Sequence, residues 1–102
     1  MASRLELQTK LEELLGSKNV YYQPPESIKM SYPAIRYSFE GYKTIRADNG
    51  IYIKVPRYDV TLISKKPDPE YVDKLIEMRG SRFGRHYESN NLHHYTFTIN
   101  NL

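Results

Sequence analysis

The chain is 102 residues long, with 15 Lys or Arg, 12 Asp or Glu and a formal net charge of +3. This length suits one hydrophobic core, so we predict a single domain over residues 1–102 without a separate catalytic domain. The charges are interspersed, and the basic residues form none of the dense runs typical of nucleic-acid-binding segments. The chain contains no cysteine, which excludes disulfides, thiolate metal ligands and a cysteine nucleophile.

Tyrosine dominates the aromatic residues, since the chain has 10 Tyr and 3 Phe but no Trp. Several tyrosines must remain at the surface, where this residue is favoured in protein interfaces because it joins a large apolar ring to a polar tip. No apolar run approaches the roughly 20 residues of a membrane span, and the N-terminus lacks the apolar core of a signal peptide. We therefore expect a soluble protein made in a cytoplasm, with no membrane partner.

The first segment predicts an amphipathic helix from about Arg4 to Leu15. Ser3 and Glu6 have the spacing of a capping box, and Gly16 follows as a stop signal. Acidic and basic residues occupy one face of this helix, so the other face is expected to lie on a core. The apolar residues recur at helical spacing, at Leu7, Leu11, Leu14 and Leu15.

Two segments that follow have extended character. Asn19–Tyr22 is short and is closed by Pro24 and Pro25, which disfavour regular pairing. After a connector at Glu26–Tyr32, the segment Pro33–Glu40 alternates apolar and polar residues at the period of a half-buried strand. Its inward positions are Ile35, Tyr37 and Phe39.

The middle of the chain predicts a long hairpin. Tyr42–Ala47 and Ile51–Val55 flank Asp48-Asn49-Gly50, and Asn-Gly tolerates the positive φ values of a tight turn. Gly41 permits a bulge, and Pro56 cannot donate to a central ladder, so we expect a break or an edge there. The two arms carry too much charge for a buried position, and we predict a hairpin that leans out of the globule. Its candidate interface residues are Lys43, Arg46, Asp48, Asn49, Tyr52 and Lys54.

The clearest strand is followed by the clearest helix. Arg57–Ser64 alternates strictly, with Tyr58, Val60 and Leu62 on the dry face. The helix begins at Pro69, because Asp68 can cap its free amides and proline fits the first helical position. Its apolar face is formed by Val72, Leu75, Ile76 and Arg79, flanked by Tyr71 and Met78, and Gly80 ends it.

A second hairpin closes the chain. Ser81–Glu88 predicts a strand with a glycine irregularity, Ser89–Asn91 a turn, and His93–Ile99 an alternating last strand. The complete order of elements favours an α+β fold, with an antiparallel or mixed β-sheet, two helices packed on one face and a protruding β-hairpin.

The three histidines are candidate metal ligands. His86 and a histidine of the facing strand could come close, but His93 and His94 are adjacent and point to opposite faces of a strand. A zinc site needs three or four converging ligands, so we expect no metal ion and no cofactor. No phosphate-binding loop or catalytic serine motif is present, and the protein is predicted not to be an enzyme and to have no catalytic residues.

The chain resembles a group of short proteins encoded in the neck and tail gene clusters of long-tailed phages and prophages of Gram-positive bacteria. The segments that carry the resemblance are Tyr21–Ser27, Tyr32–Tyr37, Arg57–Thr61, Phe83–Tyr87 and Asn91–His94. The order of elements is also similar to that of the lambda-type tail terminator family, small α/β subunits that form a hexameric ring on the end of the tail tube and join it to the head.

The resemblance implies a structural virion protein of the tail or neck, made in the host bacterial cytoplasm. It implies a tail terminator or tail-completion role, in which a homo-hexameric ring caps the tail tube and docks to the head. The implied partners are copies of the chain, the tail tube protein and a head-connector or head-closure protein. Two alternatives stay open. One is a head-closure or connector-adaptor neck protein, and the other is a small nucleic-acid-binding module, whose RNA-recognition pattern Arg82–Tyr87 matches at few positions.

Overall fold

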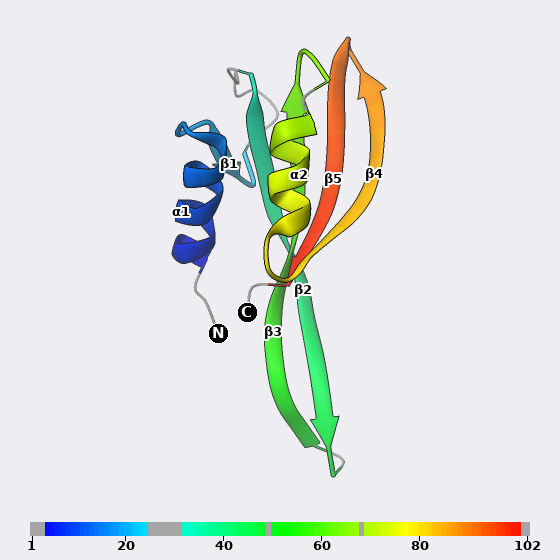
Figure 1. Cartoon of the computed structure of the whole chain (residues 1–102). Coiled ribbons are helices and arrows are strands. Elements are labelled where there is room, and N and C mark those ends of the chain that lie inside the picture. The colour runs from blue at the N-terminus through cyan, green and yellow to red at the C-terminus, as the bar shows by residue number, and fades with distance from the viewer. Residues whose placement is uncertain (1–3, 25–31, 49, 68, 101–102) are drawn as a thin grey trace.

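The computed structural model describes residues 4–24, 32–48, 50–67 and 69–100. The strands form one sheet in the order β1-β2-β3-β5-β4 (Figure 1), in which β1 is parallel to β2 and the other neighbours are antiparallel. This confirms the predicted α+β class with a mixed sheet. The elements are α1 (Arg4–Leu15), β1 (Val20–Tyr22), β2 (Ala34–Ala47), β3 (Gly50–Ser64), α2 (Pro69–Glu77), β4 (Ser81–Ser89) and β5 (Leu92–Asn100).

Some sequence predictions fall outside the described residues. They are the helix caps at Ser3 and Asp68, residue Asn49 of the turn, and the connector before Tyr32. Within the described ranges, neither helix has the length and apolar content needed to cross a membrane.

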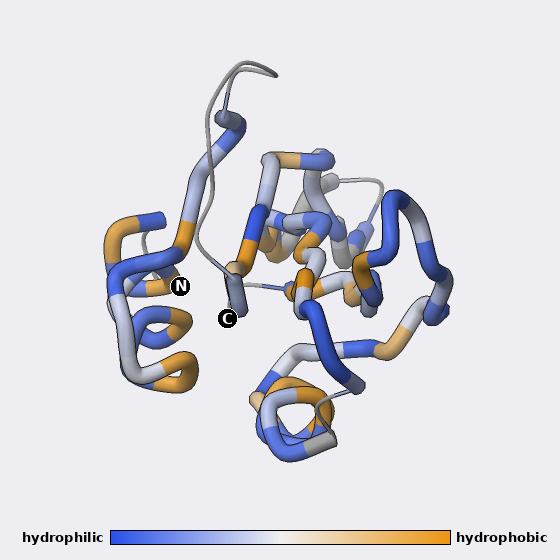
Figure 2. The backbone as a smooth tube through the Cα atoms, turned by 90° about the horizontal axis from the view of Figure 1, so that it is seen from above, coloured by the Kyte–Doolittle hydropathy of each residue, from blue (hydrophilic) through white to orange (hydrophobic). Residues whose placement is uncertain are grey.

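Both helices pack on the same core, which covers one face of the sheet. Alternate residues of β2, β3 and β5 point to this face, as strand geometry requires. Figure 2, which looks down on the molecule, shows the two helical coils outside the strands. The predicted inward positions that are buried in this core are Leu7, Leu11, Leu15, Ile35, Tyr37, Tyr58, Val60, Leu62, Val72 and Leu75, and Phe97 and Ile99 of β5 join them.

Polar side chains fix α1 against the edge of the sheet. The buried Tyr37 hydroxyl donates a hydrogen bond to the Gln8 side chain and accepts one from Arg4 Nη1 at 3.3 Å. Gln8 Nε2 donates to the Val20 carbonyl oxygen of β1 at 3.1 Å. The Arg4 guanidinium lies 4.4 Å from the ring centroid of Tyr22. Burial raises the pKa of Tyr37, so this hydroxyl remains a hydrogen-bond donor at neutral pH.

The structure places three residues outside the apolar faces of α2 and β2 on which the sequence predicted them. Ile76 is 49% exposed, because α2 packs through Val72 and Leu75 and Ile76 lies farther around the helix. Arg79 lies beyond α2, which ends at Glu77. Phe39 is 40% exposed, because it stands at the end of the covered face, next to exposed aromatic surface rather than beneath a helix.

β2 and β3 continue past the rest of the sheet. They pair from Ala34 with Ile63 to Ala47 with Gly50, whereas β5 pairs with β3 only as far as Arg57. We call residues 41–56 the ribbon. In this part of the ladder β2 and β3 pair with each other, and no third described strand lies beside them. Figure 1 shows the ribbon running beyond the ends of β4 and β5. A register shift between Phe39 and Gly41 marks its base, where a bulge was predicted.

The break expected at Pro56 is absent, since β3 runs through this residue without interruption. Pro56 pairs with Tyr42 of β2 on one side. On its other side β5 ends at Asn100, opposite Arg57, so no described strand needs a hydrogen bond from the proline nitrogen. The expected edge is present, and a proline at an edge position leaves the strand intact.

Gly80, between α2 and β4, occupies a position that a larger residue cannot fill. Its φ is +83°, and an added Cβ would lie 2.2 Å from the Asn100 carbonyl oxygen. We expect Gly80→Ala to lower the free energy of unfolding by about 2–4 kcal/mol, because left-handed strain adds to a backbone clash. Urea unfolding followed by circular dichroism measures the loss. Gly16→Ala is the matched control, with φ +74° and no atom within 4 Å of the added Cβ, and its expected cost is about 1 kcal/mol. Equal losses in the two variants would contradict the clash.

Candidate functional site

The six residues predicted as interface candidates are spread over the ribbon. Lys43 and Arg46 are exposed on β2, Lys54 is exposed on β3, and Asp48 is exposed in the turn. Asn49 and the side chain of Tyr52 lie outside what the structure describes. The four described side chains do not form one patch, because successive residues of a strand point to opposite faces.

An aromatic row leads from the core onto the ribbon. The Phe39 ring meets those of Tyr58 and Tyr42 edge-on, at centroid distances of 5.7 and 5.1 Å. Lys54 Nζ lies 4.4 Å from the Tyr42 centroid, a cation–π contact. Tyr42 is 47% exposed and Ile53 is 40% exposed. Exposed apolar side chains that continue a core are typical of association surfaces.

The opposite face of the sheet is polar, and no described helix covers it. Phe97 and Ile99 point to the helices, so Thr98 and Asn100 between and after them point to this open face. At the base of the ribbon the open face is hollowed by a groove of about 600 Å³. Its lining includes Glu40, Lys43, Arg57, Ser81, Arg82 and Asn100, and we call it the basic groove.

Positive charge is in excess in the basic groove. Arg57 Nε lies 3.5 Å from Glu40 Oε2, so one cation is paired with the one carboxylate of the lining. Lys43 and Arg82 have no acidic partner within the described part of the chain. Two exposed cations therefore stay uncompensated beside an ion pair, and the groove favours an anionic group.

Three buried polar atoms of the groove lack a hydrogen-bond partner among the described residues: Arg57 Nε, Ser81 Oγ and Asn100 Oδ1. The contact from Arg57 to Glu40 is an ion pair at a distance too long for a good hydrogen bond. Buried polar atoms in folded proteins are normally satisfied, and leaving one unsatisfied costs about 1–3 kcal/mol. The groove thus offers one donor, one acceptor and one hydroxyl to an occupant.

Asp59 lies near Glu40 beside the basic groove. Desolvation, together with the hydrogen bond and the charge of Glu40, raises the pKa of Asp59 to about 6, against the opposing effect of Arg57. Asp59 is therefore protonated under mildly acidic conditions and becomes negatively charged beside Glu40 as the pH rises through about 6.

Asp59→Asn is expected to stabilise the protein at about pH 7.5 by about 0.5–1 kcal/mol and to change its stability little at about pH 3.5. The folded pKa of about 6 exceeds the unfolded value of 3.8, so the stability from the protonated carboxyl is full below pH 3.8 and is lost as the pH rises from there through about 6. The effect is small because Asp59 is exposed and solvent screens the repulsion. Urea unfolding of both proteins at the two pH values measures it, and a wild-type stability that rises over this interval would contradict the assignment.

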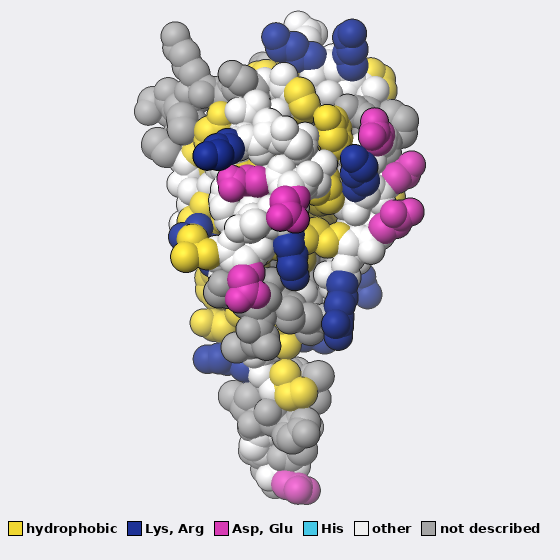
Figure 3. Space-filling view, turned by 60° about the vertical axis from the view of Figure 1, so that its left-hand side comes forward, with side chains coloured by type: hydrophobic (Ala, Val, Ile, Leu, Met, Phe, Trp, Pro, Cys, Tyr) yellow, Lys and Arg dark blue, Asp and Glu magenta, His cyan; other side chains and the backbone are white. Residues whose placement is uncertain are grey.

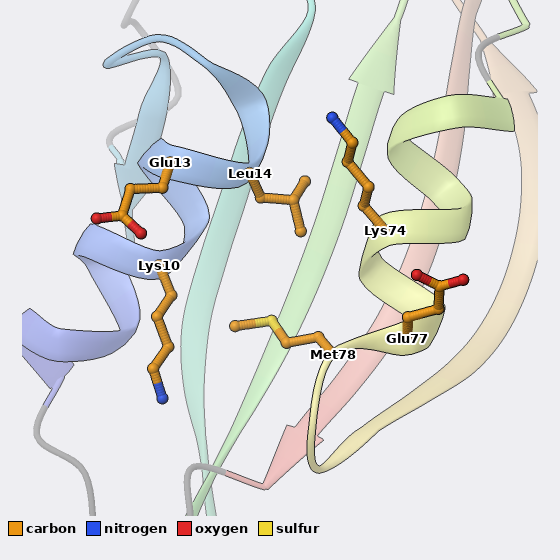
Figure 4. A pocket seen from close by; sticks show the side chains of 6 residues that line it. All are labelled: Lys10, Glu13, Leu14, Lys74, Glu77 and Met78. Carbon is orange, nitrogen blue, oxygen red and sulfur yellow. The ribbon is translucent and has the colours of Figure 1, made fainter.

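A second groove, of about 480 Å³, lies between α1 and α2 (Figure 4). Its apolar side chains are Leu14 and Met78, and its charged ones are Lys10, Glu13, Lys74 and Glu77. In Figure 3 apolar side chains are visible between charged ones on this side of the molecule. Because the two basic and two acidic side chains balance, this groove does not select a partner by charge.

The two histidines of the β4–β5 hairpin approach each other as the facing strands suggested. His86 Nε2 and His93 Nδ1 are 3.1 Å apart, and their ring planes differ by 12°. His94 points to the other face and stacks on Tyr87. The near-parallel rings suit a direct hydrogen bond. Over residues 4–24, 32–48, 50–67 and 69–100, no group of three or more possible ligands is arranged to hold a metal ion.

Sequence reasoning did not assign Glu40, Arg57, Arg82 and Asn100 to a shared site, and it considered Arg82 only within the RNA-recognition pattern Arg82–Tyr87. They lie on four different strands, and each is an ordinary polar position of its own strand. Pairing brings them together, because Arg57 stands beside both Gly41 and Asn100, and Arg82 pairs with Thr98. The only signal in the sequence is the alternation that places Arg57 on the wet face.

The fold and its surfaces define a small α+β protein with a mixed five-stranded sheet, one face covered by helices and one open polar face. A comparison with models of known protein families finds no match, and a comparison with curated proteins finds none either.

Proposed function

We propose that this chain is a structural virion protein of a long-tailed phage, a tail terminator or tail-completion protein. Copies of it form a hexameric ring that caps the finished tail tube and joins the tube to the head connector. The observation that carries the proposal is the ribbon, which continues past the five-stranded sheet and exposes apolar side chains beside basic ones.

The ribbon gains little stability from its own chain. A two-stranded hairpin is marginal in water, because pairing without a covered apolar face does not offset the loss of backbone entropy. Tyr42 and Ile53 remain in solvent at about half exposure. Coverage by a neighbouring subunit removes this apolar area from water, and the basic residues Lys43, Arg46 and Lys54 then set the register of the contact.

A closed ring of identical subunits needs two different patches on each copy, because head-to-tail contacts join unlike surfaces. The chain offers a helix-covered face with acidic residues and an open face with the basic groove. The role is one of assembly and requires no catalytic residue, metal or cofactor. Its partners are further copies, the tail tube protein and a head-connector or head-closure protein, in the neck of the virion.

Electron microscopy of the purified protein, alone and mixed with the tail tube protein, tests the tail-terminator role. We expect negative-stain images to show six-fold rings of the purified protein, alone or on the ends of tubes assembled from the tail tube protein of the same gene cluster. A tube gene directly downstream supports the same role. A protein that neither forms rings nor binds tube ends would overturn the proposal, and binding to the head connector alone would assign a head-closure or adaptor role.

A further inference from the structure

We infer that the basic groove of one copy receives the acidic outer stripe of α2 from the next copy. This contact would be the head-to-tail joint of the assembly, and the inference rests on the proposed ring. The basic groove and the acidic stripe lie on opposite faces of the molecule. The α2 helix of one copy therefore cannot bind in the groove of the same copy.

The stripe consists of Glu70, Asp73 and Glu77. Their spacing of three and four residues places them along one side of α2, and all three are exposed. Lys74 Nζ lies 3.4 Å from Glu70 Oε1 and neutralises part of the stripe, which leaves Asp73 and Glu77 without a described ion pair. Figure 3 shows acidic side chains exposed over the helix layer.

The groove and the stripe match in charge. Lys43 and Arg82 are the uncompensated cations of the groove, and Asp73 and Glu77 are the carboxylates of the stripe that have no described ion pair. Carboxylates also accept hydrogen bonds, so they suit the buried donor Arg57 Nε, which has no hydrogen-bond partner within the described residues. The groove between α1 and α2, with balanced charges, offers no comparable match.

The geometry favours a chain of copies over a symmetric pair. The groove opens on the face away from the helices, and the stripe lies on the helix layer. When the helix layer of one copy lies against the open face of the next, the first copy keeps its groove unused and the second copy keeps its stripe unused. Such contacts repeat in one direction, and they close into a ring when the rotation allows.

Cross-linking tests which surfaces meet. The chain has no native cysteine, so a Thr98→Cys and Lys74→Cys double variant carries only two thiols, one in the groove lining and one beside Asp73 on α2, and it keeps the charges of Arg82 and Asp73. We expect a short bismaleimide to produce a ladder of cross-linked species that ends at the closed ring. Each single-cysteine variant is the control and should stop at the dimer or below. No ladder above the dimer from the double variant would overturn the inference.

Charge reversal tests the energetic role of the same pair. Arg82→Glu alone and Asp73→Lys alone should each raise the concentration needed for assembly at least roughly tenfold, because like charges then face each other. Combining both changes in one chain restores opposite charges at every joint and should recover assembly. Light scattering over a dilution series measures the concentration needed for assembly. Arg36→Glu, an exposed charge of the open face outside the groove lining, is the matched control and should have little effect.

The outcomes separate this inference from the proposed function. Wild-type rings whose assembly is unchanged by Arg82→Glu and by Asp73→Lys would overturn the groove contact and leave the tail role standing. A wild-type protein that forms no rings, together with a double-cysteine variant that gives no cross-linked ladder, would overturn both. Binding of a labelled DNA duplex that Arg82→Glu abolishes, with assembly unaffected, would assign the groove to nucleic acid and overturn the inference.

Discussion

Tyr37→Ala is expected to lower the free energy of unfolding by about 3–5 kcal/mol, because it removes a large aromatic side chain from the core. Tyr37 is 1% exposed and packs beside Tyr22 and Tyr58, with ring centroids 4.9 and 5.9 Å away. Its removal leaves a cavity between α1 and the sheet. It also leaves the Gln8 side chain and Arg4 without their shared partner. Urea unfolding followed by far-UV circular dichroism measures the change.

Tyr37→Phe separates packing from hydrogen bonding. This variant keeps the ring and loses only the hydroxyl, and we expect a loss of about 1–2 kcal/mol because the Gln8 carbonyl group is left without its donor. A Tyr37→Phe variant as unstable as Tyr37→Ala would mean that the hydroxyl, rather than the ring, holds α1. A Tyr37→Ala variant that loses less than about 1 kcal/mol would contradict the assignment of this residue to the core.

Shortening the ribbon is expected to abolish ring assembly while leaving the folded core intact. Replacing residues 44–54 with Asn-Gly places the turn between Lys43 and Val55, which already face each other across the ladder. The variant loses exposed apolar area and two basic residues of the ribbon, Arg46 and Lys54. We expect the concentration for assembly to rise by roughly 100-fold or more, as loss of a central contact does at interfaces. Light scattering and negative-stain microscopy measure it.

The shortened variant carries its own control for folding. The core lies on the covered part of the sheet, so the midpoint of urea unfolding should change by little. A milder variant, Tyr42→Ser with Ile53→Ser, keeps the ribbon length and its charge and removes only the two exposed apolar side chains. Full assembly by the shortened variant would show that the ribbon is not a contact, and full assembly by the milder one would show that its charges suffice.

These expectations describe a molecule with two separate parts. The covered face supplies stability through side chains such as Tyr37, Val60 and Leu75, all at 1% exposure or less. The ribbon and the open face add charge, exposed aromatic surface and unsatisfied polar atoms, which lower the stability of an isolated copy. In the proposed assembly role, contact with a partner covers these features.

Local patterns in the sequence predicted most elements, because each pattern reports a local property of the chain. Alternation in Arg57–Ser64 and helical spacing in Arg4–Leu15 record which side of an element meets apolar surroundings. The turn between β4 and β5 was equally readable, since Asn90 and Asn91 adopt the positive φ values, 53° and 62°, that asparagine tolerates. The same patterns could not show which apolar positions the packed helices and the sheet leave uncovered. Phe39 and Ile76 were therefore expected in the core, although both are exposed.

The sequence by itself determined the class of fold, most of the dry faces of the strands at Pro33–Glu40 and Arg57–Ser64, and the position of the long hairpin, because periodicity and turn residues act over a few neighbouring positions. Only the tertiary structure decided the parallel pairing of β1 with β2, the unbroken course of β3 through Pro56 and the basic groove. The groove depends on strand register, which joins Glu40, Arg57, Arg82 and Asn100 from four strands. Register is fixed by the packing of the whole sheet, so no local stretch of residues contains it.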